Sequence, residues 1–397
     1  MQKKEERRDA SQGSKALGAV VQNYAMYIAL AVIFIGFQII SGGFFLTARN
    51  ITNLINQTGY VAVLAVGMTL VLIICQIDLS VGYVAGFLGA CAAQFLVKGM
   101  PAGAAILIVL CIGALIGLVE GVLIAKVGVP AFVTTLAFSF AARGMLTLVT
   151  ESSGTVPVVN EFFISLSNGF LPAVFRVGTL HGFTLVAGAA AIVLMVVTQI
   201  RQRNELKKYK FETSSTTAFV LKNLFFAALI GAFTLVLADY NGISWTIVIA
   251  VVITGAYNFV LNHMTIGRYI YGMGGNMEAA SLSGVDVKKI LIGVFVSMGV
   301  MAALGGILYT SRLSSATPTA GNGFELDAIA SCYIGGVSTS GGVGKVANSV
   351  VGAFVIMSLT NGLNLIGVGI SYQYIIKGII FVCAVAADVH SRGKKAV

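Results

Sequence analysis

The sequence predicts an all-α polytopic membrane protein with about 10–12 transmembrane segments. Of its 397 residues, 57% are hydrophobic and only 10% are charged, whereas soluble domains carry about 25% charged residues. The apolar residues gather in stretches that repeatedly approach the roughly 20 residues a helix needs to cross a bilayer. Because lipid offers the backbone no hydrogen-bond partners, such segments are expected to be helical.

Twelve apolar segments follow one another and are expected to form a single transmembrane domain over residues 24–390. A tail at 1–23 precedes this domain and a tail at 391–397 follows it. Residues 1–23 contain no apolar run, so the first segment is predicted to be an uncleaved span. The expected spans are 24–42, 56–76, 80–97, 102–125, 131–150, 183–200, 218–238, 243–262, 288–310, 326–339, 346–367 and 373–390.

Glycine-containing breaks indicate that some of these helices are interrupted. The segment at 326–339 is short and flanked by glycine, so we expect a broken or re-entrant helix there. The stretch from Asp78 to Ala90 is also similar to the stretch from Ser340 to Ala353, as an internal repeat would be. Transporters often repeat such broken-helix units around a central path. Because glycine is abundant in this chain, a chance similarity between the two stretches is an equally open explanation.

The basic residues predict the orientation. With twelve spans both termini lie on one side, and nineteen of the 25 lysines and arginines then fall on that side. Basic residues mark the cytoplasmic face, so both tails and the basic loop at 201–218 are predicted to be cytoplasmic. The net charge of +10 is therefore a topology signal and does not indicate nucleic-acid binding. The exceptions are Arg49, Lys98, Arg176 and Arg312 on the opposite side, and Arg143 and Lys377 within spans.

A polar insert at 265–289 separates two of the expected spans. Asn276 is a good N-cap, and Glu278 lies in the first turn, where the helix dipole favours an anion. Gly284 would end this helix, and Asp286 could cap the span that follows. We therefore expect a short capped helix outside the membrane on the cytoplasmic side. A rigid helical projection of this kind is best explained as a docking element for another protein.

Several polar side chains are expected at membrane depth, where they are costly and indicate function. Glu120 shares a helix face with Gly113 and Gly117, a small-residue face that suits close helix packing. Ser80 could cap the helix that follows Asp78. The alternative is that Asp78, Glu120 and Arg143 merely satisfy one another or free backbone groups. The pathway candidates are Asp78, Ser80, Glu120, Asn361, Asn364 and Gln373, with Glu325 and Asp327 at the outer mouth.

The chain lacks the motifs of a nucleotide-hydrolysing enzyme. The stretch at 340–346 resembles a phosphate-binding loop, but Thr339 replaces its first glycine and Val346 its magnesium-binding hydroxyl. The histidines have no zinc spacing, and the five cysteines lie in apolar segments without a C-x-x-C pair. We therefore predict no bound cofactor or metal and no enzymatic activity for this chain. If ATP drives it, another chain hydrolyses the ATP.

The string at 274–284 and nine further stretches make this chain resemble the membrane permeases of bacterial ABC importers for monosaccharides, the ribose/xylose/arabinose/galactose group. The extra pair of spans around the basic loop makes the chain most similar to xylose-type and multiple-monosaccharide permeases. The string G-G-N-M-E-A-A-S-L-S-G at 274–284 is highly specific, although Met277 and Ser281 depart from the residues common there. The other similar stretches are 46–54, 65–73, 77–82, 129–136, 141–144, 318–330, 341–346, 361–365 and 376–380.

The resemblance implies a role and a set of partners. It implies a multi-pass protein of the bacterial plasma (inner) membrane that forms a pore with a second copy of itself. A cytoplasmic ABC ATPase with two cassettes would use ATP and Mg, and an extracytoplasmic binding protein would deliver the sugar. The ATPase-coupling residues would be Gly274, Gly275, Asn276, Glu278, Ala279, Ala280, Leu282, Ser283 and Gly284.

Two other functions remain open on the sequence alone. A proton-coupled secondary sugar transporter would use Asp78 and Glu120 and would work without ATP. An intramembrane enzyme acting on a lipid-linked sugar would need a cluster of acids or metal ligands that the sequence does not display. The sugar itself is not specified by any of these patterns.

Overall fold

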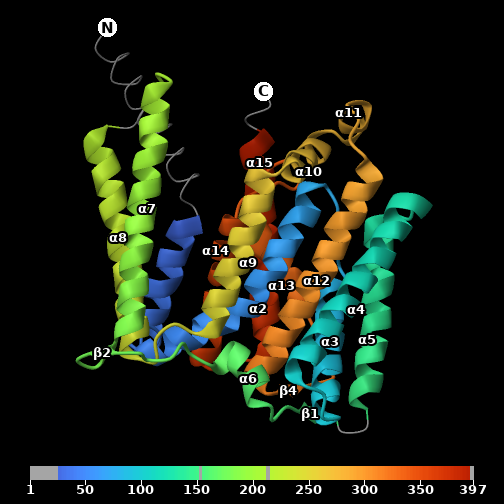
Figure 1. The fold of residues 1–397 in the computed structure, drawn as a ribbon, viewed down its shortest axis with the longest axis horizontal. Coiled ribbons are helices and arrows are strands. Elements are labelled where there is room, and N and C mark those ends of the chain that lie inside the picture. Colours follow the sequence, from blue (N-terminus) through green and yellow to red (C-terminus); the bar gives the residue numbers. More distant parts are fainter. Residues whose placement is uncertain (1–25, 152–153, 212–214, 394–397) are drawn as a thin grey trace.

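The computed structural model describes residues 26–151, 154–211 and 215–393. The predicted N-terminal tail at 1–23 and most of the C-terminal tail, from residue 394, lie outside the described residues. Within them the chain is a bundle of helices, which confirms the expected all-α membrane architecture (Figure 1). Eight described helices are long and apolar enough to cross a membrane. Shorter apolar helices occupy Met26–Ile40, Val81–Val97 and Ile370–Cys383.

After the first helix, Met26–Ile40, the elements follow in this order: α2 Ala48–Ile73, α3 Val81–Val97, α4 Ala102–Val122 with a π-helical turn at Leu123–Val127, α5 Ala131–Thr150, β1 Val156–Pro157, α6 Glu161–Asn168, β2 Arg176–Val177, β3 Leu180–His181, α7 Gly182–Lys208, α8 Thr216–Asp239, α9 Trp245–His263, α10 Thr265–Gly275, α11 Met277–Leu282, α12 Val287–Leu313, β4 Ser315–Ala316, α13 Phe324–Ile334, α14 Val346–Leu365 and α15 Ile370–Gly393.

The two ends of the bundle differ (Figure 1). One end carries α10, α11 and the C-terminal ends of α7 and α15. The opposite end carries α6 and the short strands. There β1 pairs antiparallel with β4, and β2 pairs antiparallel with β3. The sequence patterns did not predict these two-residue strands.

Helix α2 lies at the centre of the molecule and α8 at its edge. In α2, 89% of the most apolar 18-residue window is buried, whereas the corresponding share in α8 is 6%. Around α2, helices α12 and α14 bury most of their length. The hairpin of α7 and α8 stands to one side of the bundle (Figure 1). This hairpin therefore presents most of its apolar surface to its surroundings.

Close contact between α4 and α12 depends on glycine. A Cβ atom on Gly113 would collide with the carbonyl oxygen of Gly299, and one on Gly117 with that of Phe295. The expected small-residue face is therefore confirmed. Because both backbones approach so closely, a larger residue at either position would force the helices apart.

Two predicted segments differ from the structure. The basic loop at 201–218 is wrong in extent, because α7 continues as helix to Lys208 and the connection to α8 begins only at Tyr209. The segment Arg201–Lys208 is rich in Arg, Gln, Glu, Leu and Lys, which all favour helix. The insert at 265–289 contains two helices, α10 and α11, where one was expected.

Helix α13 confirms the expected short helix. It has 11 residues, or about 16 Å at 1.5 Å per residue, which is about half of the roughly 30 Å hydrocarbon core. Its N-terminal turn meets that of α3, since a Cβ on Gly82 would collide with the carboxylate of Glu325. Two helix starts therefore meet inside the bundle.

Candidate functional site

The predicted cap signals around α11 are confirmed. The side chain of Asn276 accepts a hydrogen bond from the backbone N–H of Ala279 at 2.9 Å. Gly284 ends the turn with a φ of +86°. Asp286 then caps α12 by accepting from the N–H of Lys289 at 3.1 Å. That hydrogen bond holds the pKa of the Asp286 carboxyl below its usual value.

Most of the predicted coupling residues are exposed at the end of the bundle. Gly274 and Ala280 are buried, whereas the other members of the set are exposed. Leu282 is the most telling, because 84% of this large apolar residue is exposed. An exposed leucine on a capped polar projection is suited to contact with a protein partner.

Behind α11, the end of α10 enters a contact that we call the glycine junction, formed by residues 73–75, 274–275 and 340–344. A Cβ on Gly274 would collide with the carbonyl oxygen of Ile73, which itself accepts from the N–H of Gly342 at 2.8 Å. The Cys75 thiol donates to the carbonyl oxygen of Ser340 at 3.0 Å. Tyr271, one turn earlier in α10, donates its hydroxyl to the carbonyl of Gly344 at 2.7 Å.

The glycine junction joins three parts of the chain. It contains the end of α2, which leads through residues 74–80 into α3, and the loop between α13 and α14. Because the backbones are in contact here, a displacement of α10 would also move the end of α2 and the loop between α13 and α14. The exposed projection is thus in physical contact with both interrupted parts of the bundle.

The two stretches of the predicted repeat have similar but not identical structures. In each, an irregular segment leads into a helix, α3 at Val81 and α14 at Val346. The aligned glycines differ, however, because Gly82 lies inside α3 whereas Gly344 precedes α14. A true internal repeat therefore stays a prediction.

The structure brings Asp78, Ser80 and Glu120 together. Asp78 accepts hydrogen bonds from the backbone N–H of Ser80 at 2.8 Å and from its hydroxyl at 2.7 Å. The predicted capping role of Ser80 is therefore wrong, because its side chain makes no cap bond and donates to Asp78 instead. Glu120 is only 2% exposed and neighbours Asp78 and Ser80. No hydrogen-bond partner of its Oε1 is found among the described residues.

Of the alternative that Asp78, Glu120 and Arg143 satisfy one another or free backbone groups, the part with Arg143 is wrong, whereas Asp78 does accept from a backbone N–H. The guanidinium of Arg143 lies over the ring of Tyr83, 5.5 Å from the ring centre. In the described part of the chain, the salt bridges join Lys289 to Asp286 and Lys377 to Asp327. Arg143 is exposed on α5 and therefore does not take part in the acidic group.

The predicted pathway amides pair with one another. Asn361 on α14 accepts from the side chain of Asn50 at 2.9 Å. Asn364 accepts from Gln373 on α15 at 2.7 Å. These bonds tie the ends of α14 and α15 to each other and to α2. They account for the amides structurally, and a pathway role for them stays a prediction.

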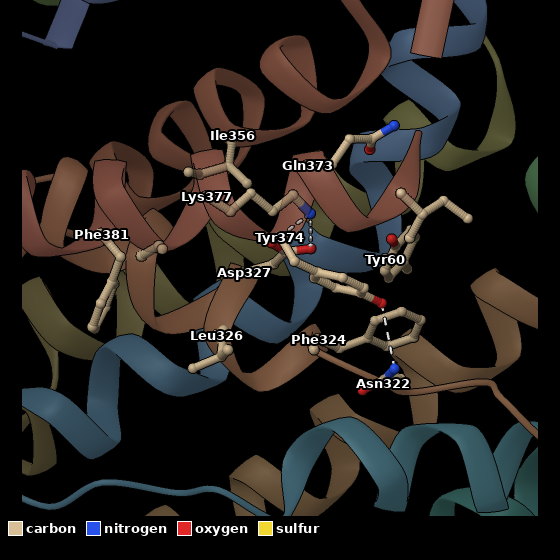
Figure 2. Close-up of a pocket in the computed structure, with 14 residues that line it drawn as sticks. Tyr60, Asn322, Phe324, Leu326, Asp327, Ile356, Gln373, Tyr374, Lys377 and Phe381 are labelled. Atoms are coloured by element: carbon tan, nitrogen blue, oxygen red, sulfur yellow. Dashed lines mark hydrogen bonds and ion pairs between the residues drawn. The ribbon is translucent and has the colours of Figure 1, made fainter. Parts of the chain in front are cut away.

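A pocket of about 280 Å³ lies between α2, α13, α14 and α15. We call it the α15 pocket (Figure 2). Lys377 on α15 donates to both carboxylate oxygens of Asp327 on α13, at 2.9 and 3.0 Å. Asn322 donates to the hydroxyl of Tyr374 at 3.3 Å. Gln373 also lines the pocket, so this residue and Asp327 meet there, whereas Glu325 lies beside Gly82 and is not part of the lining.

The sequence patterns did not select Lys377, Asn322 or Tyr60 for the pathway, although all three line the pocket. Lys377 carried the one available signal, because it is a basic residue inside a predicted span. Its partner is 50 positions away in the sequence, so the pairing becomes visible only in the fold.

Comparison with known proteins gives consistent results. The family model of the branched-chain amino acid transport system / permease component matches residues 158–385. The chain is 36% identical to the xylose transport system permease protein XylH of Haemophilus influenzae, covering 94% of this chain and 98% of that protein. It is 37% identical to XylH of Escherichia coli K12, over 95% and 93% of the two chains. It is 35% identical to the ribose import permease protein RbsC of Escherichia coli K12, over 91% and 92%. No solved structure matches significantly.

Proposed function

Because this chain belongs to the family of the branched-chain amino acid transport system / permease component, and within it to the ribose- and xylose-type ABC permeases, we propose that it is the membrane-spanning subunit of an ATP-driven monosaccharide importer. The family consists of multi-pass inner-membrane transport subunits and not of enzymes. Xylose or a related sugar is the proposed substrate, since relatives named for xylose and for ribose are similar along nearly the whole chain.

The observation that carries the proposal is the capped, exposed α11 in contact with the glycine junction. We place a cytoplasmic ABC ATPase with two cassettes, which uses ATP and Mg, against residues 274–284. A rigid helix can transmit a push, whereas a flexible loop would absorb it. The buried Gly274 conveys the displacement to the end of α2 and to the loop before α14.

The remaining parts of the assembly follow from the two ends of the bundle. A second copy of the chain completes the pore. An extracytoplasmic sugar-binding protein docks on the end formed by α6, β1 and β4 and releases sugar into the pathway. ATP binding and hydrolysis favour different conformations of the ATPase, and this difference in contact free energy drives alternating access.

The test changes the surface of α11 without touching the bundle. Glu278 and Ala279 are both exposed, so the double variant Glu278→Arg/Ala279→Arg should insert and fold normally. We expect sugar uptake and sugar-stimulated ATP hydrolysis by the reconstituted complex to be lost. The control is Asn204→Arg/Glu205→Arg, which changes the charge by the same amount at exposed positions of α7 at the same end, because it too replaces one acidic and one neutral residue by arginine. Normal coupling in the α11 variant would contradict the proposal.

A second candidate is a proton-coupled transporter, favoured by the buried pair of Asp78 and Glu120 and by the unpartnered Oε1 of Glu120. It predicts uptake by this chain alone in liposomes, abolished by an uncoupler and indifferent to ATP. The importer predicts no uptake without the ATPase, so the two functions are separated by a single reconstitution.

A further inference from the structure

We propose that the α15 pocket binds one neutral monosaccharide during its passage through the permease. The inference rests on the proposed import function and adds to it a site for the substrate within this chain. It is carried by three observations: the size of the pocket, the chemistry of its polar groups, and its position on α13.

The size and lining of the pocket fit a small solute. Its 280 Å³ lies near the lower limit of the roughly 300–1,000 Å³ typical of small-ligand pockets. Gln373, Tyr374, Lys377, Gly378 and Phe381 recur at helical spacing, so one face of α15 forms a wall. Such a lining combines aromatic surface with a few polar groups, as ligand sites do.

The polar groups favour hydroxyls over charges. Lys377 is neutralised by Asp327, so the pair offers no net charge to an ionic ligand. The carboxylate still has free lone pairs, and an ammonium has three N–H groups of which the bonds to Asp327 use two. Neighbouring sugar hydroxyls, each a donor and an acceptor, match such a pair. A sugar phosphate would instead place a second anion beside Asp327.

The aromatic side of the pocket is adjustable. Tyr374 is 49% exposed, and its hydroxyl accepts the hydrogen bond from Asn322. At 3.3 Å this hydrogen bond is longer than the usual 2.7–3.2 Å, so a sugar hydroxyl can replace it at small cost. Tyr60 and Phe324, with ring centres 4.7 Å apart, provide apolar surface for the C–H face of the sugar.

The pocket is connected to the glycine junction through α13. Phe324 and Asp327 lie in the first turn of this helix, and its other end leads to the loop at 340–344. Because α13 is one short helix, movement at the glycine junction would displace Asp327 relative to Lys377. Opening and closing of the pocket would therefore follow the ATPase cycle.

The first test fills the pocket. Gly378 lines the pocket, and a Cβ on it meets no atom within 4 Å, so Gly378→Phe can be accommodated and its ring can reach into the pocket. The matched control is Gly255→Phe on α9, an exposed glycine with equally open surroundings. In liposomes with ATPase and binding protein, we expect Gly378→Phe to reduce xylose uptake at subsaturating sugar about tenfold, equivalent to about 1.4 kcal/mol. Sugar-stimulated ATP hydrolysis should persist, because the binding protein and ATPase still dock.

The second test measures occupancy directly. In a background without native cysteines, the thiol of Gly378→Cys should react with a small maleimide, and xylose should slow this reaction. By mass action, protection should be about tenfold at a sugar concentration about ten times the dissociation constant. Xylose 5-phosphate should not protect, and neither sugar should protect Gly255→Cys.

The outcomes separate this inference from the proposed function. Wild-type uptake by Gly378→Phe, or the absence of xylose protection at Gly378→Cys, would overturn the sugar site while leaving the importer intact. Loss of dimer assembly in Gly378→Phe would also overturn it, because the groove would then belong to the second copy. If wild-type protein instead imports xylose without ATPase, the importer itself is wrong.

Discussion

Gly274 is the residue at which the projection touches the bundle most closely. Its missing side chain allows the carbonyl oxygen of Ile73 to approach, and that oxygen also accepts from Gly342. We expect Gly274→Ala to push α10 away from both neighbours and to reduce uptake per ATP hydrolysed at least about tenfold, since it must break close backbone contacts. The ratio of xylose transported to ATP hydrolysed in liposomes measures this.

The control is Gly272→Ala, two residues earlier in the same helix. A Cβ on Gly272 meets nothing within 4 Å, so only helix propensity changes, and in a favourable direction. Equal transport ratios for the two variants would show that the glycine junction does not transmit the displacement.

The stability that the Asp286 cap gives to the start of α12 is expected to depend on pH. The N–H of Lys289 lowers the pKa of the folded Asp286 below its unfolded value of 3.8. A carboxyl with a lowered pKa stabilises the fold above the unfolded value, and this contribution disappears as the pH falls through the folded value. Asp286→Asn retains a cap oxygen but cannot titrate, so its deficit in thermal stability relative to wild type should shrink between pH 6 and pH 3.

That comparison isolates one group, because the other carboxyls titrate alike in both proteins. The measurement is the unfolding temperature in detergent at each pH. A deficit that is constant over the range, or that grows on acidification, would show that the cap bond is not made by an ionised Asp286.

At the scale of elements, α4 and α12 pack closely because the glycines of α4 leave no side chains between the two backbones. We expect Gly117→Ala to destabilise the protein by about 1–3 kcal/mol, the usual cost of overpacking a close contact. The cause is the collision of the new Cβ with the carbonyl group of Phe295. Gly103→Ala on the same helix is the control, because a Cβ there meets no atom within 4 Å.

Thermal unfolding of the two purified variants in detergent tests this expectation. A drop confined to Gly117→Ala would locate the cost in the α4–α12 contact. Similar unfolding temperatures would mean that the two helices can separate without penalty.

Elements that depend on local signals could be predicted from the sequence, and those that depend on distant partners could not. The caps at Asn276 and Asp286 use atoms within three residues, so their chemistry is readable directly. The strand pairing of Val156 with Ala316 joins residues 160 positions apart, and no local pattern predicts it. Ser80 failed as a cap because a neighbouring carboxylate, Asp78, captured its hydroxyl.

At the scale of the whole molecule, the candidate site also contains parts set by local sequence signals and parts set by distant partners. The exposed face of α11 follows from composition and capping, so this capped projection could be predicted from the sequence, and its role in coupling stays a prediction. The glycine junction could not be, because it requires α10 to meet two other segments of the folded chain. The α15 pocket likewise depends on Lys377 and Asp327 facing each other across two helices. Interrupted helices were predictable, but their meeting at Gly82 and Glu325 was not.

The orientation of the molecule in the membrane is the property on which the partners depend. Basic residues are concentrated at the end that carries α10, α11 and the end of α7, and basic residues mark the cytoplasmic face. We therefore expect Glu278→Cys and Asn204→Cys, in a background without native cysteines, to react with a membrane-impermeant maleimide only after the membrane is opened. Arg176→Cys in β2 and Thr179→Cys beside it should react in intact spheroplasts.

All four positions are exposed, so differences in labelling report the side of the membrane and not local burial. Two positions are used at each end, so that the result does not depend on a single substitution. Glu278 lies in α11 and Asn204 in α7, whereas Arg176 lies in β2 and Thr179 in the turn after it. The ATPase uses cytoplasmic ATP, so labelling of Glu278→Cys in intact spheroplasts would place α11 out of its reach. The same result would move the α6 end to the cytoplasm, where no extracytoplasmic binding protein could dock, and both proposed partners would lose their sites together.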